Sequence, residues 1–327
     1  MEGTSGKMKS GIRKALVTGG CGFIGSHIAE ALNACGCEVV VLDNLSTGKR
    51  LNLKHISSDV ELVEGDIREP EHVERAVKGC DVVFHQAAVV SVPKTVAHPV
   101  ESAVVNELGT LNVLEAARLN KIRRVVMASS CAVYGDDPQL PKHEGLMTNP
   151  LSPYAVQKLF GEHYARIYSQ LYGVETACLR YFNVFGPRQD PSSPYSGVIS
   201  IFFKKAMLKQ KPVIYGDGNQ CRDFIFVKDV VTANLLAAQA EGISGCRFNI
   251  GTGQPVRINT LWEHISRLAC CSVTPEYAAV RAGDIRQSVA DISLARSGLG
   301  FDFNYSLEDG LEMTYDWFDK CPEGLCG

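Results

Sequence analysis

Short apolar segments alternate with longer amphipathic ones through the first half of the chain. The short segments, rich in valine and leucine, lie at residues 15–18, 38–42, 61–63, 81–85 and 124–128. Stretches with helical spacing of apolar residues separate them, above all at 26–34 and 100–119. Short valine-rich runs predict buried strands, and 3.6-residue periodicity predicts helices. Strands that alternate with helices pair in parallel, so this pattern predicts a parallel sheet with helices on both faces.

The pattern changes near Tyr181, where turn-rich segments such as 186–191 and 215–219 interrupt shorter elements. We therefore predict an α/β fold, a Rossmann-type doubly wound parallel sheet with a smaller C-terminal α/β substrate lobe. The expected sheet domain comprises residues 12–180 plus about 223–250, with strand 246–250 returning to the sheet. The expected lobe comprises 181–222 and 251–327. Residues 1–11 are polar and contain glycine, and we expect them to form a disordered leader.

Size and charge exclude several classes of partner. A chain of 327 residues is long enough for a nucleotide-binding domain and a second lobe. A net charge of −3 provides no basic field, so we expect no nucleic-acid partner. No apolar run approaches the roughly 20 residues that span a bilayer, so we expect no membrane partner and a cytoplasmic location.

Twelve cysteines raise the question of a metal site or a disulfide framework. Cys270 and Cys271 are adjacent, and no Cys-x-x-Cys pair occurs that could begin a zinc site. We therefore expect no metal and interpret most of the cysteines as small buried apolar residues. The sequence assigns no role to Cys321 and Cys326.

A glycine-rich turn follows the first predicted strand. Gly19, Gly22 and Gly25 lie between strand 15–18 and helix 26–34. Glycines allow a tight turn, and the N-terminus of the following helix attracts a pyrophosphate. The spacing therefore predicts a dinucleotide site.

Two acidic residues bear on which dinucleotide binds. Asp43 ends the second predicted strand, eighteen residues past Gly25, where a carboxylate accepts hydrogen bonds from the ribose diol and repels a 2′-phosphate. NAD is therefore favoured over NADP. Asp66 follows the third predicted strand, where a carboxylate can meet the adenine ring.

Tyr154 and Lys158 stand one helical turn apart, on one face of a predicted helix that begins with Ser152 as N-cap and Pro153 at its first position. A free tyrosine has a pKa of about 10, so a tyrosine base needs the phenolate to be stabilised by about 4 kcal/mol to lower that pKa by about three units. We expect the Lys158 charge and the helix dipole to lower the pKa of Tyr154.

Ser130 ends the fifth predicted strand. Ligands of open α/β sheets bind at the carboxyl ends of the strands, so this hydroxyl is expected to face the cofactor. Ser130 can hydrogen-bond a substrate hydroxyl while Tyr154 removes its proton.

These motifs together resemble the extended short-chain dehydrogenase/reductase family, and within it the nucleotide-sugar 4-epimerases. The resemblance runs from about Lys14 to about Tyr315. Its further motifs are His85-Gln86-Ala87-Ala88, Val133-Tyr134-Gly135 after Ser130, and residues 180–186. Residues 91–94, 183–191 and 283–288 are similar to UDP-N-acetylglucosamine 4-epimerases of bacterial O-antigen pathways.

The resemblance implies roles for residues by position. Catalysis falls to Ser130, Tyr154 and Lys158. NAD is expected to contact Gly19, Gly22, Phe23, Ile24, Gly25, Asp43, Asn44, Asp66, Ile67, Gln86, Ala87, Ala88, Asn106, Tyr154, Lys158 and Tyr181. The UDP-sugar is expected to contact Ser91, Ser130, Asn183, Val198, Tyr215, Arg222, Arg281, Asp284 and Ser288.

The resemblance also implies the reaction and the sugar. Tyr154 takes the 4-hydroxyl proton as hydride passes from C4 to tightly held NAD, the 4-keto sugar rotates, and hydride returns to its other face. Ser288 occupies a position that borders the C2 substituent, where a small side chain leaves room for an N-acetyl group. The expected activity is that of a UDP-N-acetylglucosamine 4-epimerase, with action on UDP-glucose as well.

Other functions remain open. Sugar 4,6-dehydratases and UDP-xylose-forming decarboxylases carry carboxylates where this chain has Cys131 and Ala132, so both reactions are disfavoured. A UDP-glucose 4-epimerase, a UDP-glucuronate 4-epimerase and a non-enzymatic NAD or nucleotide-sugar sensor are the alternatives. The resemblance further implies a homodimer that packs through a four-helix interface, formed by helices 100–119 and 154–171.

Overall fold

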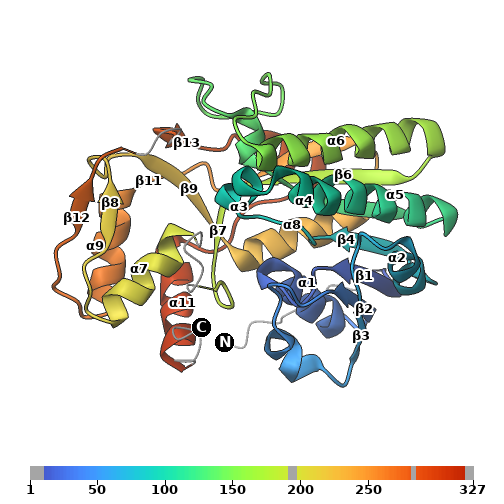
Figure 1. Cartoon of the computed structure of the whole chain (residues 1–327), viewed down its shortest axis with the longest axis horizontal. Helices are drawn as coiled ribbons and strands as arrows, with labels where there is room; N and C mark the ends of the chain where they lie inside the picture. Colours follow the sequence, from blue (N-terminus) through green and yellow to red (C-terminus); the bar gives the residue numbers. More distant parts are fainter. Residues whose placement is uncertain (1–10, 191–196, 281–284, 321–327) are drawn as a thin grey trace.

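The computed structural model describes residues 11–190, 197–280 and 285–320. Its centre is a seven-stranded parallel sheet in the order β10-β6-β5-β4-β1-β2-β3 (Figure 1). The strands of this sheet are β1 (Lys14–Thr18), β2 (Glu38–Asp43), β3 (Val60–Glu64), β4 (Val82–His85), β5 (Arg124–Ser130), β6 (Glu175–Tyr181) and β10 (Cys246–Ile250). The α/β fold expected from the sequence is confirmed.

Helices cover both faces of the sheet. On one face, α1 (Phe23–Ala34) and α8 (Val227–Gln239) contact each other and share an apolar core with the strands. On the other face, α2 (Pro70–Val77), α5 (Gly109–Leu119) and α6 (Pro153–Tyr172) pack in a row. Burial on both faces explains why the central strands are continuous valine-rich runs.

The sheet changes direction of winding at β1. This strand lies between β2 and β4, and the chain crosses from one side of it to the other. At such a switch point the loops after neighbouring strands separate, which leaves a crevice at the carboxyl ends of β1 and β4.

The helix expected at 100–119 is present, with one π turn inside it. The structure contains α4 (Pro99–Ala103), a π-helical segment η2 (Val104–Leu108) and then α5. A π turn holds one residue more than an α turn, and such insertions are frequent at functional sites. Here the π turn contains Asn106, which is buried and hydrogen-bonded to the backbone of Val89.

The remaining strands and helices form a second lobe, on the left of Figure 1. Its sheet contains β7 (Asn183–Phe185), β9 (Cys221–Phe226), β11 (Pro255–Arg257) and β13 (Gln287–Ser288), and a second ribbon pairs β8 (Val213–Tyr215) with β12 (Glu276–Ala278). Helices α7 (Val198–Met207), α9 (Ile258–Leu268) and α11 (Leu307–Lys320) enclose an aromatic core that includes Phe203 and Trp262.

Short helical elements also occur in the segments that join these strands and helices. They are η1 (Arg50–Ile56), α3 (Val92–Ala97), η3 (Cys131–Tyr134) and α10 (Ser293–Leu299). As the sequence predicted, β10 returns to pair with β6, so the chain enters the lobe and comes back to the main sheet. The boundaries proposed for the two domains stay predictions. Within the described ranges, no helix is long and apolar enough to cross a membrane.

Candidate active site

A cavity of about 630 Å³ opens at the carboxyl ends of the central strands. It is lined by every residue that the sequence assigned to the cofactor except Asn106, and by all three candidate catalytic residues. Its size falls within the range of cavities that hold small ligands and cofactors. The fold therefore brings the residues that the motifs assigned to the cofactor and to catalysis around one cavity at the switch point of the sheet.

The glycine-rich turn forms a close-packed cradle at one end of this cavity. Gly19 has a φ of +67°, and a Cβ there would lie 2.8 Å from the backbone of Ala87. Gly22 is the N-cap of α1 and supplies no side chain to bond the first N–H groups of the helix. Those donors are left to a ligand, and with the helix dipole they suit a pyrophosphate. The turn therefore fits a dinucleotide.

Asp43 is buried beside this turn. Its two carboxylate oxygens accept backbone hydrogen bonds from Cys21 at 2.9 Å and from Leu45 at 2.8 Å. Burial raises the pKa of Asp43, and these two bonds oppose the rise. A carboxylate has about four lone-pair positions, so Asp43 can still accept from a ribose diol.

Asp66 also lines the cavity and is held by its neighbours. It accepts from the Asn44 amide at 2.7 Å and from the Arg68 guanidinium at 2.8 Å. Burial alone would raise the pKa of Asp66, but the bonds from Arg68 and Asn44 outweigh burial and hold that pKa at about 2. The carboxylate is therefore ionised at neutral pH.

The start of α6 is built as the sequence predicted. Ser152 is the N-cap, its hydroxyl accepts from the backbone of Ala155 at 3.2 Å, and Pro153 is the first helical residue. Tyr154 is thereby presented toward the end of β5, where Ser130 accepts a hydrogen bond from the backbone of Ala132 at 3.2 Å.

The pKa of Tyr154 differs in direction from the sequence expectation. Burial raises the pKa of this phenol to about 12, and a hydrogen bond with Ser130 opposes the rise. The Lys158 ammonium instead donates to the Ala128 carbonyl oxygen at 2.8 Å and lies 5.9 Å from the centre of the tyrosine ring. Burial also lowers the pKa of Lys158 to about 8.

Asn106 lies under the cavity wall and does not line it. Its amide accepts from Val89 N at 2.7 Å and donates to Val89 O at 3.0 Å, and it also donates to Gln157 at 2.7 Å. Val89 does line the cavity. Asn106 therefore acts on the site through the backbone of Val89.

Of the residues assigned to the substrate, the described ones other than Ser130 lie outside the lining of this cavity. Ser91 caps α3 by accepting from Lys94 N at 3.2 Å. The remaining described ones lie on the second lobe: Asn183 on β7, Val198 on α7, Tyr215 on β8, Arg222 on β9 and Ser288 on β13. Arg281 and Asp284 fall outside the described residues.

Two of the lobe residues meet near the catalytic serine. Ser288 pairs with Arg222 across the β13–β9 ribbon. The Ser288 hydroxyl bonds the thiol of Cys131, which follows Ser130 in the chain. Ser288 thus lies close to the end of β5.

A buried carboxylate fixes this part of the lobe. Asp223, next to Arg222 on β9, accepts from the backbone and hydroxyl of Thr252 at 2.8 and 2.7 Å. It also accepts from Gly253 N at 2.9 Å and Ala290 N at 3.0 Å. One side chain therefore joins β9, the loop after β10 and the segment that follows Ser288.

The sequence reasoning missed several residues that line the cavity. Lys94, His98 and Glu101 reach it from α3 and α4, and Arg68 reaches it beside Asp66. Lys94 was visible as the last residue of the motif at 91–94, but no role was assigned to it. The approach of these loop and short-helix residues to the site depends on tertiary packing. Unlike a strand end, it leaves no periodic pattern in the sequence.

Glu162 was also missed. It lies one further turn along α6 from Tyr154 and Lys158, and it accepts from Arg180 Nε at 2.8 Å and Arg180 Nη2 at 2.6 Å. Ser129, the residue before Ser130, donates to the same carboxylate at 2.5 Å. This buried group therefore ties the catalytic helix to β5 and β6, and its signal in the sequence was the repeated four-residue spacing.

The fold and this site define an NAD-dependent enzyme of the extended short-chain dehydrogenase/reductase class. Residues 15–251 match the model of the NAD dependent epimerase/dehydratase family. The chain belongs to that family, and NAD is its cofactor.

Known proteins of similar sequence and structure cover nearly the whole chain. A UDP-glucose 4-epimerase of Mycolicibacterium smegmatis is 39% identical over 314 residues, which are 93% of this chain and 98% of that protein. The structure of a UDP-N-acetylglucosamine 4-epimerase from Methanobrevibacter ruminantium is similar with a TM-score of 0.90 and 40% identity, covering 94% of this chain and 98% of that one. The Thermus thermophilus UDP-glucose 4-epimerase, solved with NAD, has a TM-score of 0.85 and 38% identity, covering 94% and 99%.

Proposed function

We propose that this enzyme is a nucleotide-sugar 4-epimerase that interconverts UDP-N-acetylglucosamine and UDP-N-acetylgalactosamine and also acts on UDP-glucose. The proposal of an acetylated substrate rests on the position of Ser288. Its small side chain, 9% exposed, lies beside Cys131 at the end of the catalytic strand. A hydroxymethyl group there leaves volume for an acetamido substituent, whereas a large ring would fill it.

The chain's own residues supply the proton chemistry. Tyr154 is the group that removes the proton of the sugar 4-hydroxyl and later returns a proton to the 4-keto oxygen. Ser130 accepts from Ala132 N, so its own proton is available to the substrate oxygen or to the phenolate of Tyr154. A hydrogen bond to the phenolate stabilises its charged form and so lowers the pKa of Tyr154, as a base at neutral pH requires.

Lys158 has donors for the backbone and for the cofactor as well as for the phenolate of Tyr154. One of its three N–H donors is used on the Ala128 carbonyl. The other two are left for the cofactor ribose and the phenolate of Tyr154. NAD, when bound, supplies the nicotinamide ring that accepts a hydride and gives it back, so the overall reaction consumes no oxidant.

The residues that follow Ser130 support epimerisation over elimination. Cys131 and Ala132 carry no group able to remove a C5 proton, and burial raises the pKa of the Cys131 thiol to about 11. A thiol with that pKa is protonated at neutral pH and cannot serve as a base.

A substrate panel tests the proposal. The purified protein, without added NAD, is incubated separately with UDP-N-acetylglucosamine, UDP-glucose and UDP-glucuronate, and the C4 epimers are quantified by NMR. We expect interconversion of the first two. Turnover of UDP-glucose alone would support the second candidate, a UDP-glucose 4-epimerase, which the name of the Mycolicibacterium smegmatis relative favours. Binding without turnover would indicate a sensor.

We also propose that the enzyme is a homodimer that buries an apolar surface on α4, η2 and α6. Six residues form this surface, here called the helical stripe, and two of them, Val100 and Leu171, are 76% and 70% exposed. The stripe consists of Val100, Val104, Leu108, Val156, Ile167 and Leu171. Leu114, on the following helix α5, is fully buried in the core and is not part of the stripe. Exposed apolar patches of this kind mark interaction surfaces.

A further inference from the structure

The segment after β7 extends from the second lobe to the cofactor cavity. Residues 187–190, here called the strap, follow β7 and lie beside α1 (Figure 1). Gln189 of the strap lines the cavity. Its amide is held from the lobe side, since it donates to the Val184 carbonyl at 3.2 Å and accepts from the Ser200 hydroxyl at 2.7 Å. The second lobe therefore contributes part of the wall of the cofactor cavity.

The strap is anchored to α1. The Arg188 guanidinium donates to the Glu30 carboxylate at 2.5 Å and to the Ser26 hydroxyl at 3.3 Å. The neighbouring Pro187 carbonyl accepts from His27 Nε2 at 3.0 Å. The Arg188 side chain is only 13% exposed, so solvent screens this ion pair less than a surface pair. The first residues of α1 line the cavity, so this anchor lies close to the cradle for the pyrophosphate.

The strap is also anchored to the loop after β2. Lys49 Nζ lies 3.1 Å from the Asp190 carboxylate. The backbone of Lys49 donates to the Cys21 carbonyl at 2.9 Å, within the glycine-rich turn. The neighbouring Gly48 lies so near Asp43 that a Cβ there would be 2.8 Å from its carboxylate. The strap is therefore bonded to both walls that flank the adenosine end of the cavity.

Arg188 adopts a backbone conformation that arginine does not favour. Its φ is +68°, in the left-handed region. That region is unfavourable for a residue with a Cβ, and such residues persist where surrounding contacts hold them. Glycine would adopt this φ freely. The contacts of the Arg188 side chain, rather than its backbone preference, therefore account for its place in the strap.

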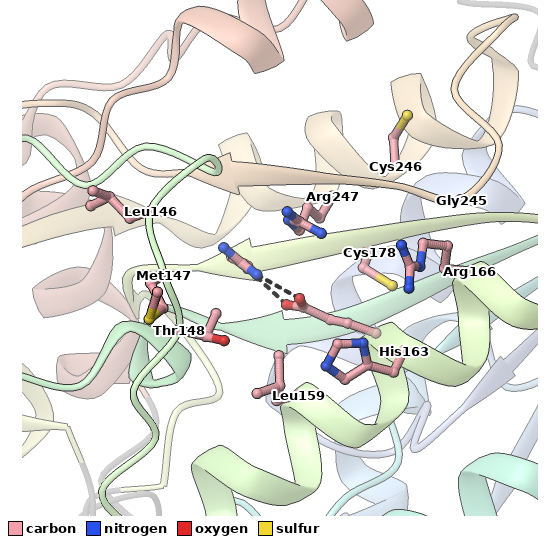
Figure 2. Close-up of a pocket in the computed structure, with 12 residues that line it drawn as sticks. Leu146, Met147, Thr148, Leu159, His163, Arg166, Cys178, Gly245, Cys246 and Arg247 are labelled. Atoms are coloured by element: carbon pink, nitrogen blue, oxygen red, sulfur yellow. Dashed lines mark hydrogen bonds and ion pairs between the residues drawn. The ribbon is translucent and has the colours of Figure 1, made fainter.

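A second cavity offers NAD no other way out. It has a volume of about 240 Å³ and lies between α6, β6 and β10 (Figure 2). Within the described ranges, its lining shares no residue with the cofactor cavity. Its volume is below the range of about 300–1,000 Å³ typical of sites for drug-sized ligands, so a dinucleotide does not fit it. Release of NAD therefore depends on the cofactor cavity itself, where the strap lies.

We propose that the strap closes the adenosine end of the cofactor cavity and slows the release of NAD, and that Arg188 is the residue that positions it. For NAD to leave past the strap, the ion pair between Arg188 and Glu30 has to break first. The inference rests on NAD as the cofactor and on no particular sugar, so it stands apart from the proposed substrate.

The test measures how fast the holoenzyme releases NAD. Protein loaded with radiolabelled NAD is mixed with an excess of unlabelled NAD, and the label that stays bound is followed over time by gel filtration. Arg188→Gly, which suits the positive φ, and Glu30→Ala should each release NAD at least about tenfold faster than wild type, because each removes a charge-assisted contact of the strap. Arg296→Ala breaks an ion pair with Asp302 outside the cavity lining and is the control.

Two further variants separate a positioning role from a general loss of structure. Arg188→Lys keeps the charge and should release NAD at a rate between those of wild type and Arg188→Gly. The double variant of Arg188→Gly and Glu30→Ala should be no faster than the faster single variant, because both changes remove the same contact. The Tm of each variant, measured in saturating NAD, should stay close to that of wild type.

The rates decide the proposal. Faster release from both single variants than from wild type and Arg296→Ala establishes the strap. Equal rates for wild type and Glu30→Ala, or an equal rise in Arg296→Ala, refute it. If Arg188→Gly does not fold, Glu30→Ala decides alone, because Glu30 is 40% exposed on α1 and its loss leaves the core intact. The rates are measured without any sugar, so they are unaffected by the outcome of the substrate panel.

Discussion

The ammonium of Lys158 donates to the carbonyl oxygen of Ala128 at 2.8 Å, so the catalytic helix α6 is bonded directly to the strand that carries Ser130. The same lysine lies beside the ring of Tyr154, 5.9 Å from its centre, rather than against the phenol oxygen. This hydrogen bond to the backbone of β5 therefore fixes the position of the candidate catalytic residues on α6. Burial raises the pKa of Tyr154 in this arrangement, and the hydrogen bond with Ser130 opposes that rise.

Replacing Tyr154 with phenylalanine should abolish most of the catalysis. The ring packing is kept and the proton acceptor is lost, so kcat should fall by about 10²–10⁴-fold, as is typical when a general base is removed. Affinity for the UDP-sugar should change little, which a separate binding titration checks. A variant that retains more than a tenth of wild-type kcat would show that another group takes the proton.

Replacing Ser288 with tyrosine should change the substrate range. A phenol ring and an acetamido group cannot occupy one volume, and such a clash discriminates more strongly than a lost contact. We expect kcat/KM for UDP-N-acetylglucosamine to fall by at least about tenfold while that for UDP-glucose is kept. Ser288→Ala is the control, since it removes the hydroxyl and adds no volume. Equal losses on both sugars in Ser288→Tyr would remove this residue from the specificity argument.

Replacing Glu162 with glutamine should destabilise the protein severely. The change leaves the buried Arg180 guanidinium without its counter-charge, and breaking such a pair from one side costs about 3–5 kcal/mol of unfolding free energy. The double variant Glu162→Leu with Arg180→Met should be less destabilised than the sum of the single variants, because no unpaired charge remains. Denaturant unfolding of wild type, Glu162→Leu, Arg180→Met and the double variant measures this difference, and strict additivity would contradict it.

His27 should make stability depend on pH below neutrality. Its Nε2 atom donates to the Pro187 carbonyl at 3.0 Å, and burial, aided by the charge of Arg188, lowers its pKa from 6.5 to about 4. The unfolded chain therefore binds a proton between pH 6.5 and 4 while the folded chain does not, so stability is present above pH 6.5 and is lost as pH falls toward 4. A shift of this size corresponds to about 3 kcal/mol.

The variant His27→Gln isolates this contribution, because its amide can still donate to Pro187. The unfolding free energy of the variant, measured from pH 7 to pH 4, should fall less steeply than that of wild type. Parallel curves for the two proteins would exclude His27 as the source.

Placing a charge on the helical stripe should separate the proposed dimer. Leu171→Glu puts a carboxylate on a residue that is 70% exposed in one subunit, so folding of the subunit is expected to survive while association is lost. Light scattering at micromolar concentration should give a dimer for wild type and a monomer for the variant. Leu51→Glu, a change of the same kind at an exposed leucine outside the stripe, should remain dimeric. A wild-type monomer would refute the dimer itself.

The residues that the sequence predicted well are those whose spacing follows a regular element. The glycine-rich turn, Asp43 and Ser130 are each adjacent to the end of an apolar run, and parallel strands bring all such ends to one edge. Tyr154 and Lys158 share a helix face for the same geometric reason. These positions therefore follow from local pattern and from the rules of the α/β fold.

What the sequence could not supply depends on contacts between distant segments. The rise that burial causes in the pKa of Tyr154 has no local sequence pattern, because it depends on the segments that pack around the phenol. The π turn around Asn106 arises with a hydrogen bond to Val89, seventeen residues earlier in the chain. The partners of Glu162 come from two further strands, so its role was invisible although its spacing was regular.

The buried carboxylate of Asp223 bears on how the substrate range of such an enzyme can diverge. Because this one side chain holds β9, the loop after β10 and the segment after Ser288 in fixed relation, the backbone around Ser288, where we propose that the sugar binds, has little freedom to adapt to a larger or smaller substituent. New sugar preferences would then evolve by exchange of single side chains on a constant backbone, with the proton and hydride chemistry of the other domain left unchanged.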